Sequence, residues 1–302
     1  MEKKILCLIC FCVSASQASA TEVWIGRYFQ NSITRFNLEA GTNLGSVDGG
    51  SVSSPLGMLR LPNGEVFATS EATNTIRRYS ATGTYMGIFA NAGLSAPTAL
   101  ATNASGEIFA ANFNSSSITK YAANGTYLGE FVTAASGLVS GPDLGMTFGP
   151  DGNLYVPNYY THHVARFNGV TGAFMGNFIP GGSGGLITPR QLLWRDGKLY
   201  VASDDGSKVL RYDGTTGAFI DEFVAAGSGT LSGAAGMAFL GNTLYVTSWR
   251  NGKLLKFDAT TGASQGVALS GLGSPVSIQL VPEPATVGFL ALGLAAMVRH
   301  RR

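Results

Sequence analysis

Aromatic and amide side chains gather in six short segments that recur along the chain. The segments are Tyr28–Asn31, Glu71–Asn74, Phe113–Ser115, Tyr159–His163, Asp204–Gly206 and Trp249–Asn251. Exposed aromatic rings with nearby amides and carboxylates suit the apolar faces and the hydroxyls of sugars. Tyr, Trp and Arg also concentrate binding energy against protein partners. The pattern predicts a ligand-binding surface made by Tyr28, Phe29, Phe113, Tyr159, Tyr160, His162, Trp249 and Arg250.

Four of the same segments begin with, or directly follow, a side chain that carries an oxygen ligand. These four residues, at equivalent positions of the chain, are Glu71, Asn112, Asn158 and Asp204. Carboxylate and amide oxygens are the ligands that Ca²⁺ takes in proteins. The four residues therefore form a candidate site for Ca²⁺ or another divalent cation, which is the cofactor that the sequence suggests.

Two further patterns do not form a reactive site. His162 and His163 are adjacent, so in an extended strand their side chains point to opposite sides. The remaining histidine is His300, near the end of the chain, which leaves no three-histidine zinc site. Gly181–Gly185 formally satisfies G-x-S-x-G, but it lacks the strand-to-helix elbow that a nucleophilic serine needs. We therefore predict no catalytic residue.

Short strands in a repeated unit must position these segments. One strand with an apolar and aromatic pair follows a turn, as in Gly152–Val156, and the next ends in a basic and aromatic pair, as in Arg211–Tyr212. A turn glycine and an outer strand such as Tyr85–Phe89 follow. A more apolar strand precedes each unit, for example Leu144–Phe148. Successive copies are about 42 to 46 residues apart, the period of a propeller blade.

Four antiparallel strands per unit predict the fold. Apolar and polar residues alternate within each strand, as expected for a sheet packed between neighbouring blades. The first unit has no apolar strand before Glu22, and Val276–Leu280 supplies one from the far end of the chain. Pairing these termini would close the ring and remove a pair of free sheet edges. The prediction is an all-β, six-bladed β-propeller over residues 21–281, closed by a C-terminal strand that completes the N-terminal blade.

The connections between the predicted strands fall into two kinds. The first-to-second and third-to-fourth turns are short and nearly uniform, whereas the second-to-third and blade-to-blade connections vary in length and chemistry. In a propeller the two variable kinds emerge on the same face. Variable loops on a rigid scaffold are where function usually lies, so this face is the expected working surface.

The repeats resemble the NHL and streptogramin-lyase-like propellers and are similar to YncE- and SMP-30-type rings. The copy Leu144–Val156 shows the resemblance best, and it extends over nearly all of residues 21–281. These families include binders, lyases and lactonases, so the resemblance implies the fold and leaves the function open. Lactonases of the SMP-30 type use Glu, Asn and Asp in a similar arrangement, which implies a metal-dependent enzyme as an alternative.

The N-terminus is typical of a secretory signal peptide over residues 1–20. A basic start at Lys3 and Lys4 precedes an apolar run, and Ala18 and Ala20 form the small-residue site that signal peptidase accepts. All three cysteines, Cys7, Cys10 and Cys12, lie in this leader. The mature chain then contains no disulfide, no thiol nucleophile and no thiolate ligand.

The C-terminus, residues 282–302, has the features of a sorting signal. Pro282, Glu283 and Pro284 precede an apolar stretch that ends at Val298, and Arg299, Arg301 and Arg302 follow it. As a helix, this stretch would be roughly 21 Å long against roughly 30 Å of hydrocarbon, which makes it a marginal permanent anchor. An ordinary transmembrane helix is the alternative.

These C-terminal residues resemble the PEP-CTERM sorting signal of Gram-negative bacteria. In that family an exosortase, a membrane-embedded transpeptidase, recognises the signal, which is often linked to exopolysaccharide production. The resemblance implies signal peptidase and exosortase as partners during export. It also implies transient membrane anchoring through a short apolar C-terminal helix, and a final location at the cell surface or in the extracellular matrix.

Charge and export together favour a binding function. The chain has 20 Lys and Arg against 18 Asp and Glu, but much of the basic excess lies in the two terminal signals. No electrostatic footprint for nucleic acid remains between them. The leading hypothesis is a non-catalytic binding or scaffold protein for exopolysaccharide or a surface protein. The alternatives are a metal-dependent lactonase or lyase on the same face and a structural matrix component without a discrete ligand.

Overall fold

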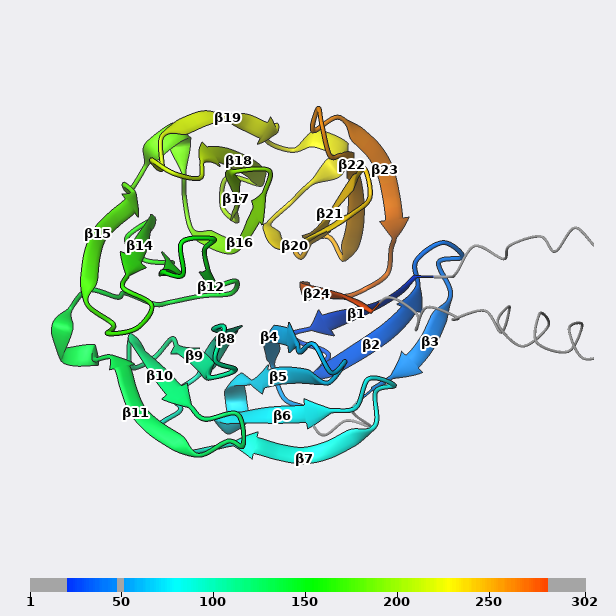
Figure 1. Cartoon of the computed structure of the whole chain (residues 1–302). Helices are drawn as coiled ribbons and strands as arrows, with labels where there is room; N and C mark the ends of the chain where they lie inside the picture. Colours follow the sequence, from blue (N-terminus) through cyan, green and yellow to red (C-terminus); the bar gives the residue numbers. More distant parts are fainter. Residues whose placement is uncertain (1–20, 48–51, 282–302) are drawn as a thin grey trace, which may run out of the picture.

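The chain forms a six-bladed β-propeller in the computed structural model, which describes residues 21–47 and 52–281 (Figure 1). Six four-stranded antiparallel sheets stand around a central axis, as the repeat predicts. The predicted signal peptide and the predicted apolar C-terminal helix lie outside the described residues. Within the described ranges, no helix has both the length and the apolar character needed to span a membrane.

The four strands of each blade follow one another from the axis outward. Blade A consists of β24 (Pro275–Val281), β1 (Glu22–Arg27), β2 (Ser32–Asn37) and β3 (Asn43–Ser46). Blade B consists of β4 (Pro55–Arg60), β5 (Val66–Ser70), β6 (Thr75–Tyr79) and β7 (Tyr85–Ala90). Blade C consists of β8 (Pro97–Thr102), β9 (Ile108–Asn112), β10 (Ser117–Tyr121) and β11 (Tyr127–Val132).

The second half of the ring repeats this order. Blade D consists of β12 (Thr147–Phe148), β13 (Leu154–Asn158), β14 (His163–Phe167) and β15 (Phe174–Ile179). Blade E consists of β16 (Pro189–Arg195), β17 (Lys198–Ser203), β18 (Lys208–Asp213) and β19 (Phe219–Val224). Blade F consists of β20 (Ala234–Leu240), β21 (Thr243–Ser248), β22 (Lys253–Asp258) and β23 (Ser264–Leu269). Single 3-10 turns occur at η1 (Glu71–Thr73), η2 (Ala134–Ser136), η3 (Ser183–Gly185) and η4 (Ser228–Thr230).

The two ends of the described chain close the ring within blade A. Strand β24 pairs antiparallel with β1, with Val23 opposite Leu280 and Ile25 opposite Ile278. This pairing confirms that a C-terminal strand completes the N-terminal blade. It also gives the inner edge of β1 the hydrogen-bonding partner that this edge would otherwise lack.

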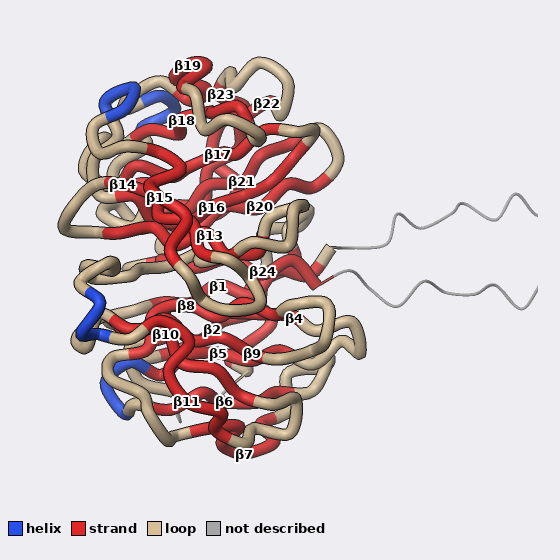
Figure 2. Tube along the Cα trace, turned by 60° about the vertical axis from the view of Figure 1, so that its left-hand side comes forward, coloured by secondary structure: helices blue, strands red, loops and turns tan. Residues whose placement is uncertain are grey.

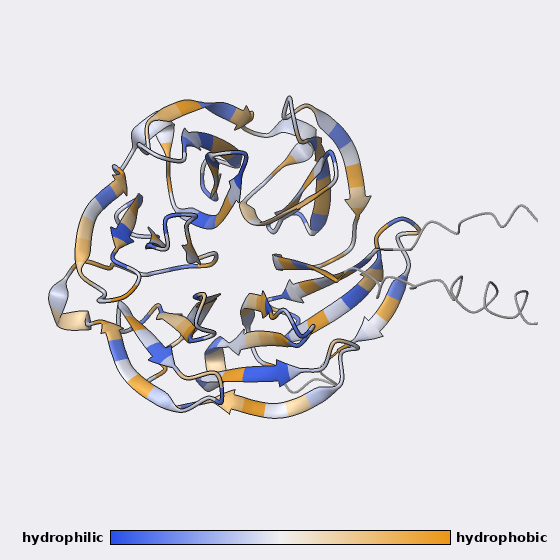
Figure 3. Ribbon diagram, in the orientation of Figure 1, coloured by the Kyte–Doolittle hydropathy of each residue, from blue (hydrophilic) through white to orange (hydrophobic). Residues whose placement is uncertain are grey.

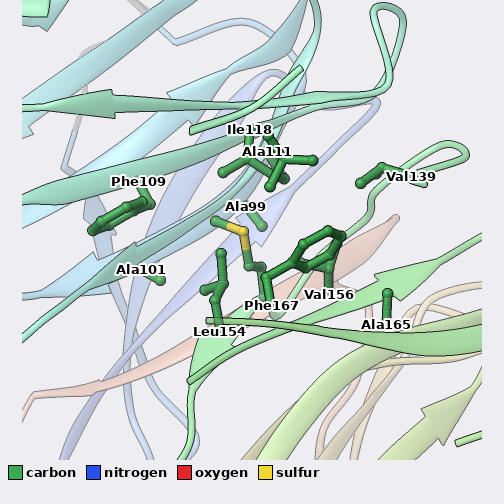
Figure 4. Packing of buried hydrophobic residues seen from close by; sticks show 12 residues of the cluster. Ala99, Ala101, Phe109, Ala111, Ile118, Val139, Leu154, Val156, Ala165 and Phe167 are labelled. Atoms are coloured by element: carbon green, nitrogen blue, oxygen red, sulfur yellow. The ribbon is translucent and has the colours of Figure 1, made fainter. Parts of the chain in front are cut away.

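The core lies between blades rather than in one central mass. Phe109, Leu154 and Phe167 are fully buried where blades C and D meet, and Figure 4 shows side chains of both blades directed toward one another. In the outer strands β15 and β19, apolar residues at both ends flank a polar middle (Figure 3). The C-terminal end of each of these strands is buried, whereas the N-terminal end is exposed.

The recurring turn glycine is required by the contact between blades. Gly217 has a φ of 74°, and a Cβ there would collide with the carbonyl oxygen of Phe178 in the preceding blade. Gly172 makes the same approach to the carbonyl of Phe131. Only glycine combines a positive φ with such an approach, so these turns are fixed by packing as well as by local conformation.

The inner strand of blade D is shorter than the sequence predicts. The apolar pattern predicts a strand over Leu144–Phe148, but β12 contains only Thr147 and Phe148. Gly145 has a φ of 86°, and the amide of Leu144 donates to Oδ1 of Asp143 instead of to a ladder partner. Upstream, an isolated bridge joins Pro142 to Asn158. The chain thus leaves the ladder around Asp143, close to the axis.

The propeller has two different faces, which we call the loop face and the turn face. The loop face carries the second-to-third strand loops and the blade-to-blade connections, including all four 3-10 turns. The turn face carries the short turns, together with Glu22 and Val281, the paired ends of β1 and β24. In Figure 2 the helical turns lie on the left, and the two described ends of the chain leave on the right.

Candidate functional site

A pocket of about 300 Å³ opens at the centre of the loop face. In five of the six blades, the first residue after the second strand lines this pocket. These residues are far apart in the sequence, but they come together because equivalent strand ends meet around the axis. These five residues are Tyr28, Glu71, Phe113, Tyr159 and Trp249. The full lining is Tyr28, Phe29, Leu56, Glu71, Thr98, Phe113, Asp143, Tyr159, Tyr160, Arg190, Trp249 and Val276.

Six of the twelve residues that line the pocket are aromatic. The ring centroids of Tyr28 and Phe29 are 5.0 Å apart. Phe113 lies 5.9 Å from Tyr159 and 5.3 Å from Tyr160, and the last two are 5.4 Å from each other. Phe29 and Tyr160 are 68% and 60% exposed, so they stand at the rim. Edge-to-face and tilted contacts such as these hold the rings in place while leaving other ring surfaces open to a ligand.

A buried arginine lies at the base of the pocket. Arg190, on β16, has its Nε 2.8 Å from Oδ2 of Asp204 and 3.5 Å from Oδ2 of Asp143. Its guanidinium carbon lies 5.8 Å from the ring centroid of Tyr159 and 5.5 Å from that of Trp249. Burial would disfavour each of these charges alone, so the arginine and the two carboxylates depend on one another.

A second arginine extends this network to the rim. The Nη2 of Arg250 lies 2.9 Å from Oδ1 of Asp204 and 2.5 Å from Oδ1 of Asp205. The indole Nε1 of Trp249 donates to Oδ1 of Asp204 at 2.8 Å. Burial raises the pKa of the Asp204 carboxyl, although Arg190, Trp249 and Arg250 act to lower it. Asp204 is thus the hub that joins blades E and F.

Glu71 is arranged differently from the other acids. Its Oε2 accepts a hydrogen bond from the hydroxyl of Tyr28 at 2.5 Å. Burial raises the pKa of Glu71 and the nearby Asp143 adds to this, although the hydrogen bond from Tyr28 and the charge of Arg190 act to lower it. Burial and the contact with Glu71 raise the pKa of Tyr28 to about 12. Among the described residues, Glu71 forms no ion pair.

The pocket brings together most of the residues that the sequence suggested for ligand binding. Six of them line it: Tyr28, Phe29, Phe113, Tyr159, Tyr160 and Trp249. Arg250 lies beside Trp249 but is held by Asp204 and Asp205. His162 is not in the lining, and its Nδ1 accepts a hydrogen bond from the Thr188 amide at 3.0 Å.

The four residues suggested for a cation have other partners in the structure. Oδ1 of Asn112 accepts from the Ser95 amide, and Oδ1 of Asn158 accepts from the Ser140 amide. Neither asparagine lines the pocket, whereas Glu71 does and Asp204 binds two arginines. In residues 21–47 and 52–281, no group of three or more His, Cys, Asp or Glu gathers as metal ligands do. The calcium site stays a prediction.

Sequence reasoning missed Asp143 and Arg190. Both follow a proline at the start of an innermost strand segment, as do Leu56, Thr98 and Val276 in other blades. The dipeptide Pro-X therefore occurs in five blades, and its second residue lies in the pocket each time. A charged residue at this otherwise apolar or small position is the signal that could have revealed both residues.

The axis opens differently toward the turn face, where the lining has no charged side chain among the described residues. A second cavity of about 420 Å³ lies among the innermost strands and is lined mainly by backbone and apolar side chains, including Met58, Leu100, Met146, Met237 and Phe239. None of the described residues that line it is Asp, Glu, Lys or Arg. Of the described side chains that line these two cavities, the charged ones therefore all lie at the loop face.

Comparison with known proteins identifies the C-terminal signal and supports the fold. Residues 280–302 match the model of the PEP-CTERM protein-sorting motif. This match confirms the predicted motif and indicates exosortase-dependent export with surface association through the tail. A search of curated proteins found no relative of this sequence.

Solved structures with similar propellers share little sequence with this chain. A chain of a nidogen–laminin complex superposes with a TM-score of 0.71 at 15% identity, covering 86% of this chain and 98% of that one. A catalytically inactive virginiamycin B lyase from Staphylococcus aureus, solved with quinupristin, gives 0.62 at 20% identity, covering 87% and 89%. A streptogramin B lyase gives 0.63 at 16%, covering 87% and 90%. At these identities the likeness shows the fold alone.

Proposed function

We propose that this exported protein is a non-catalytic binding protein of the cell surface, and that its loop-face pocket holds a sugar unit of an exopolysaccharide. The observation that carries the proposal is the wall of six aromatic side chains around a pocket with a polar, charged base. Ring faces suit the apolar C–H face of a sugar, and the polar groups suit its hydroxyls. A volume of about 300 Å³ lies at the lower end of the usual range for ligand sites, roughly 300–1,000 Å³, and favours one small ring.

The position of the sorting signal supports a surface role for this pocket. Val281, the last described residue, ends β24 on the turn face, and the matched motif spans residues 280–302. An anchor attached through that motif therefore joins the propeller at the turn face. The pocket opens on the opposite face, which leaves it accessible to polymer outside the cell.

The charges in the pocket favour binding over hydrolysis. Glycoside hydrolysis commonly uses two carboxyl groups, one as acid and one as base or nucleophile. Asp143 and Asp204 are buried against Arg190, and Asp205 is bound by Arg250. Of the acids that the structure describes at this site, only Glu71 has no cationic partner. One such carboxylate can recognise a ligand but does not complete an acid–base pair.

A lyase reaction is the main rival. One similar structure is a virginiamycin B lyase made inactive by replacing a histidine with alanine. In this chain neither His162 nor His163 lines the pocket. The Nδ1 of His162 is engaged by Thr188, and burial lowers the pKa of His163. The histidines of the described residues are therefore not placed to act on a ligand in the pocket.

Binding of the exported protein to surface polysaccharide from the producing cells tests the proposal. Isothermal titration should show binding without product formation, and Trp249→Phe should weaken it about tenfold, because the indole area and its donor to Asp204 are lost. Trp194→Phe is the matched control. Trp194 packs on Tyr155 away from the pocket, and its Nε1 has no hydrogen-bond partner to lose among the described residues.

Two outcomes would contradict the proposal. The first is an absence of binding to every polysaccharide fraction. The second is turnover of a lactone or a streptogramin-type substrate that requires a divalent metal. Turnover of that kind, lost in Glu71→Gln and Asp204→Asn, would establish the metal-dependent alternative instead.

A further inference from the structure

The loop-face pocket has an excess of negative charge. Glu71 and Asp143 line the pocket against one guanidinium group, that of Arg190. Asp204, Asp205 and Arg250 lie beside the lining and add two carboxylates and one guanidinium group. Both arginines are already bound to carboxylates at 2.5 to 3.5 Å. They are therefore poorly placed to receive an additional anion from a ligand.

The unbalanced charge is located at Glu71. Its carboxylate lines the pocket and receives one hydrogen bond, from the neutral hydroxyl of Tyr28. A carboxylate that is removed from water without a counterion is unfavourable, and burial accordingly raises the pKa of Glu71. A cation delivered by a ligand would relieve this cost, since it would supply the missing partner in a partly desolvated site.

The aromatic wall adds to the attraction for a cation. Tyr28 and Phe29 lie in edge-to-face contact, and Tyr28 also holds the Glu71 carboxylate. Ring faces carry negative electrostatic potential and attract ammonium groups. The same wall already accommodates one internal cation, since Arg190 lies 5.8 Å from the ring of Tyr159. Glu71 lies in blade B and Arg190 in blade E; across the pocket the charge of Arg190 acts to lower the pKa of Glu71, but the ion pairs of Arg190 are made with Asp143 and Asp204.

We propose that the sugar unit bound in this pocket is an amino sugar whose protonated amine pairs with Glu71 while its ring stacks on the aromatic wall. This inference rests on the proposed function and specifies its ligand. An acidic sugar would meet the excess of carboxylates. An N-acetylated sugar would present a neutral amide to Glu71 and leave its charge without a partner.

The test compares two oligosaccharides of equal length, one of glucosamine and one of N-acetylglucosamine, by titration into the exported protein at a pH below the pKa of the sugar amine and above that of Glu71, so that the amine is protonated and the carboxyl group is ionised. The free-amine oligomer should bind about tenfold more tightly, as expected for a charge-assisted contact. Glu71→Gln keeps the side-chain shape and an acceptor for Tyr28 but removes the charge. It should abolish this preference by lowering the affinity for the free-amine oligomer to that for the acetylated one.

Control variants separate failure of this inference from failure of the proposed function. Glu65→Gln changes an acid on the turn face and should affect neither oligomer. Equal binding of the two oligomers by the unmodified protein, still weakened by Trp249→Phe, would overturn the amino-sugar inference and leave the sugar site standing. A lysine-rich peptide that binds more tightly than either oligomer, and depends on Glu71, would assign the pocket to a protein partner and overturn the inference.

Discussion

Six carboxyl groups on the turn face and two on the loop face have pKa values shifted in opposite directions. On the turn face the pKa is lowered for Glu22, Glu65, Glu107, Asp151, Asp213 and Asp258. On the loop face burial raises the pKa of Glu71 and Asp204. Asp205, at the exposed rim, is the exception there, because hydrogen bonds from Arg250 and Thr188 outweigh the effect of its burial on its pKa.

Acids on the turn face serve the structure of the blades. The side chain of Arg78 hydrogen-bonds Glu65 and lowers its pKa. Backbone amides of the third-to-fourth turns lower the pKa of Asp213 and Asp258 in the same way. Each of these contacts stabilises the ionised acid with a donor from the same blade. Contacts of this kind recur around the ring, which marks them as part of the repeat.

Acids on the loop face depart from the repeat and are buried at a cost. Glu71 and Asp204 each directly follow the second strand of their blade, a position that an aromatic residue takes in the other four blades. Asp204 also depends on arginines from two blades. Acids with raised pKa values in a pocket are characteristic of functional sites. The repeat therefore supplies the scaffold, whereas departures from the repeat supply the site.

Removal of β24 should have the largest effect on stability, because the structure of both faces depends on closure of the ring. A chain of residues 21–274 should show no cooperative unfolding transition, since β1 loses its inner partner and β24 no longer packs against β4 and β20. A chain of residues 21–281 is the control. Urea titration followed by near-ultraviolet circular dichroism measures the difference. Equal cooperativity of the two chains would show that closure by β24 is dispensable.

Replacement of Arg190 should sharpen the contrast between the faces. Arg190→Met leaves Asp143 and Asp204 buried without their shared cation, which should lower the free energy of unfolding by about 3–5 kcal/mol. Arg78→Met breaks the partly exposed pair with Glu65 on the turn face and should cost about 1 kcal/mol or less. Urea denaturation at neutral pH measures both. Similar losses would mean that the loop-face network is no more interdependent than a surface pair.

The pH dependence of stability should differ in sign between the two faces and be the smallest effect. The pKa of Glu71 is raised in the folded protein. Its contribution to the free energy of unfolding is therefore full at low pH and is lost as pH rises from about 4.5 through the folded pKa. Glu71→Gln should therefore become more stable relative to the unmodified protein as pH increases. The pKa of Glu65 is lowered in the folded protein. Its contribution to the free energy of unfolding is therefore present above about pH 4.5 and is lost as pH falls through the folded pKa.

Thermal or urea unfolding of the unmodified protein, Glu71→Gln and Glu65→Gln between about pH 3 and about pH 8 measures these differences. The Glu65→Gln variant should lose stability relative to the unmodified protein as pH rises from the acid end, opposite to Glu71→Gln. Two difference curves of the same sign would remove the distinction between the faces.

Much of the fold could be predicted because each blade is built from local signals. The turn glycines, the apolar–aromatic pairs and the split first blade indicate the blade count and the closing strand, and β24 pairs with β1 as expected. The shortened β12 was not predicted, since the left-handed conformation of Gly145 and the capping contact of Asp143 are not visible in the apolar pattern of Leu144–Phe148.

The sequence predicted part of the lining of the candidate pocket, and the residues that it misplaced have a physical explanation. Six aromatic residues were found because they follow the second strand in their repeats, a position that strand order alone brings to the axis. His162 lies in a similar segment, but its Nδ1 accepts a hydrogen bond from the Thr188 amide. Asn112 and Asn158 accept hydrogen bonds from backbone amides of the preceding connection. The direction of each side chain depends on contacts that spacing does not encode.

The sequence by itself determined the number of blades, the way the ring closes, the sorting motif and the types of side chain available on the loop face. Only the tertiary structure decided which charges meet. Arg190, Asp143 and Asp204 come from separate segments, and their pairing at the base of the pocket leaves Glu71 without an ion pair among the described residues. Ion pairs between blades depend on distances across the ring, and those distances exist only once the ring has closed.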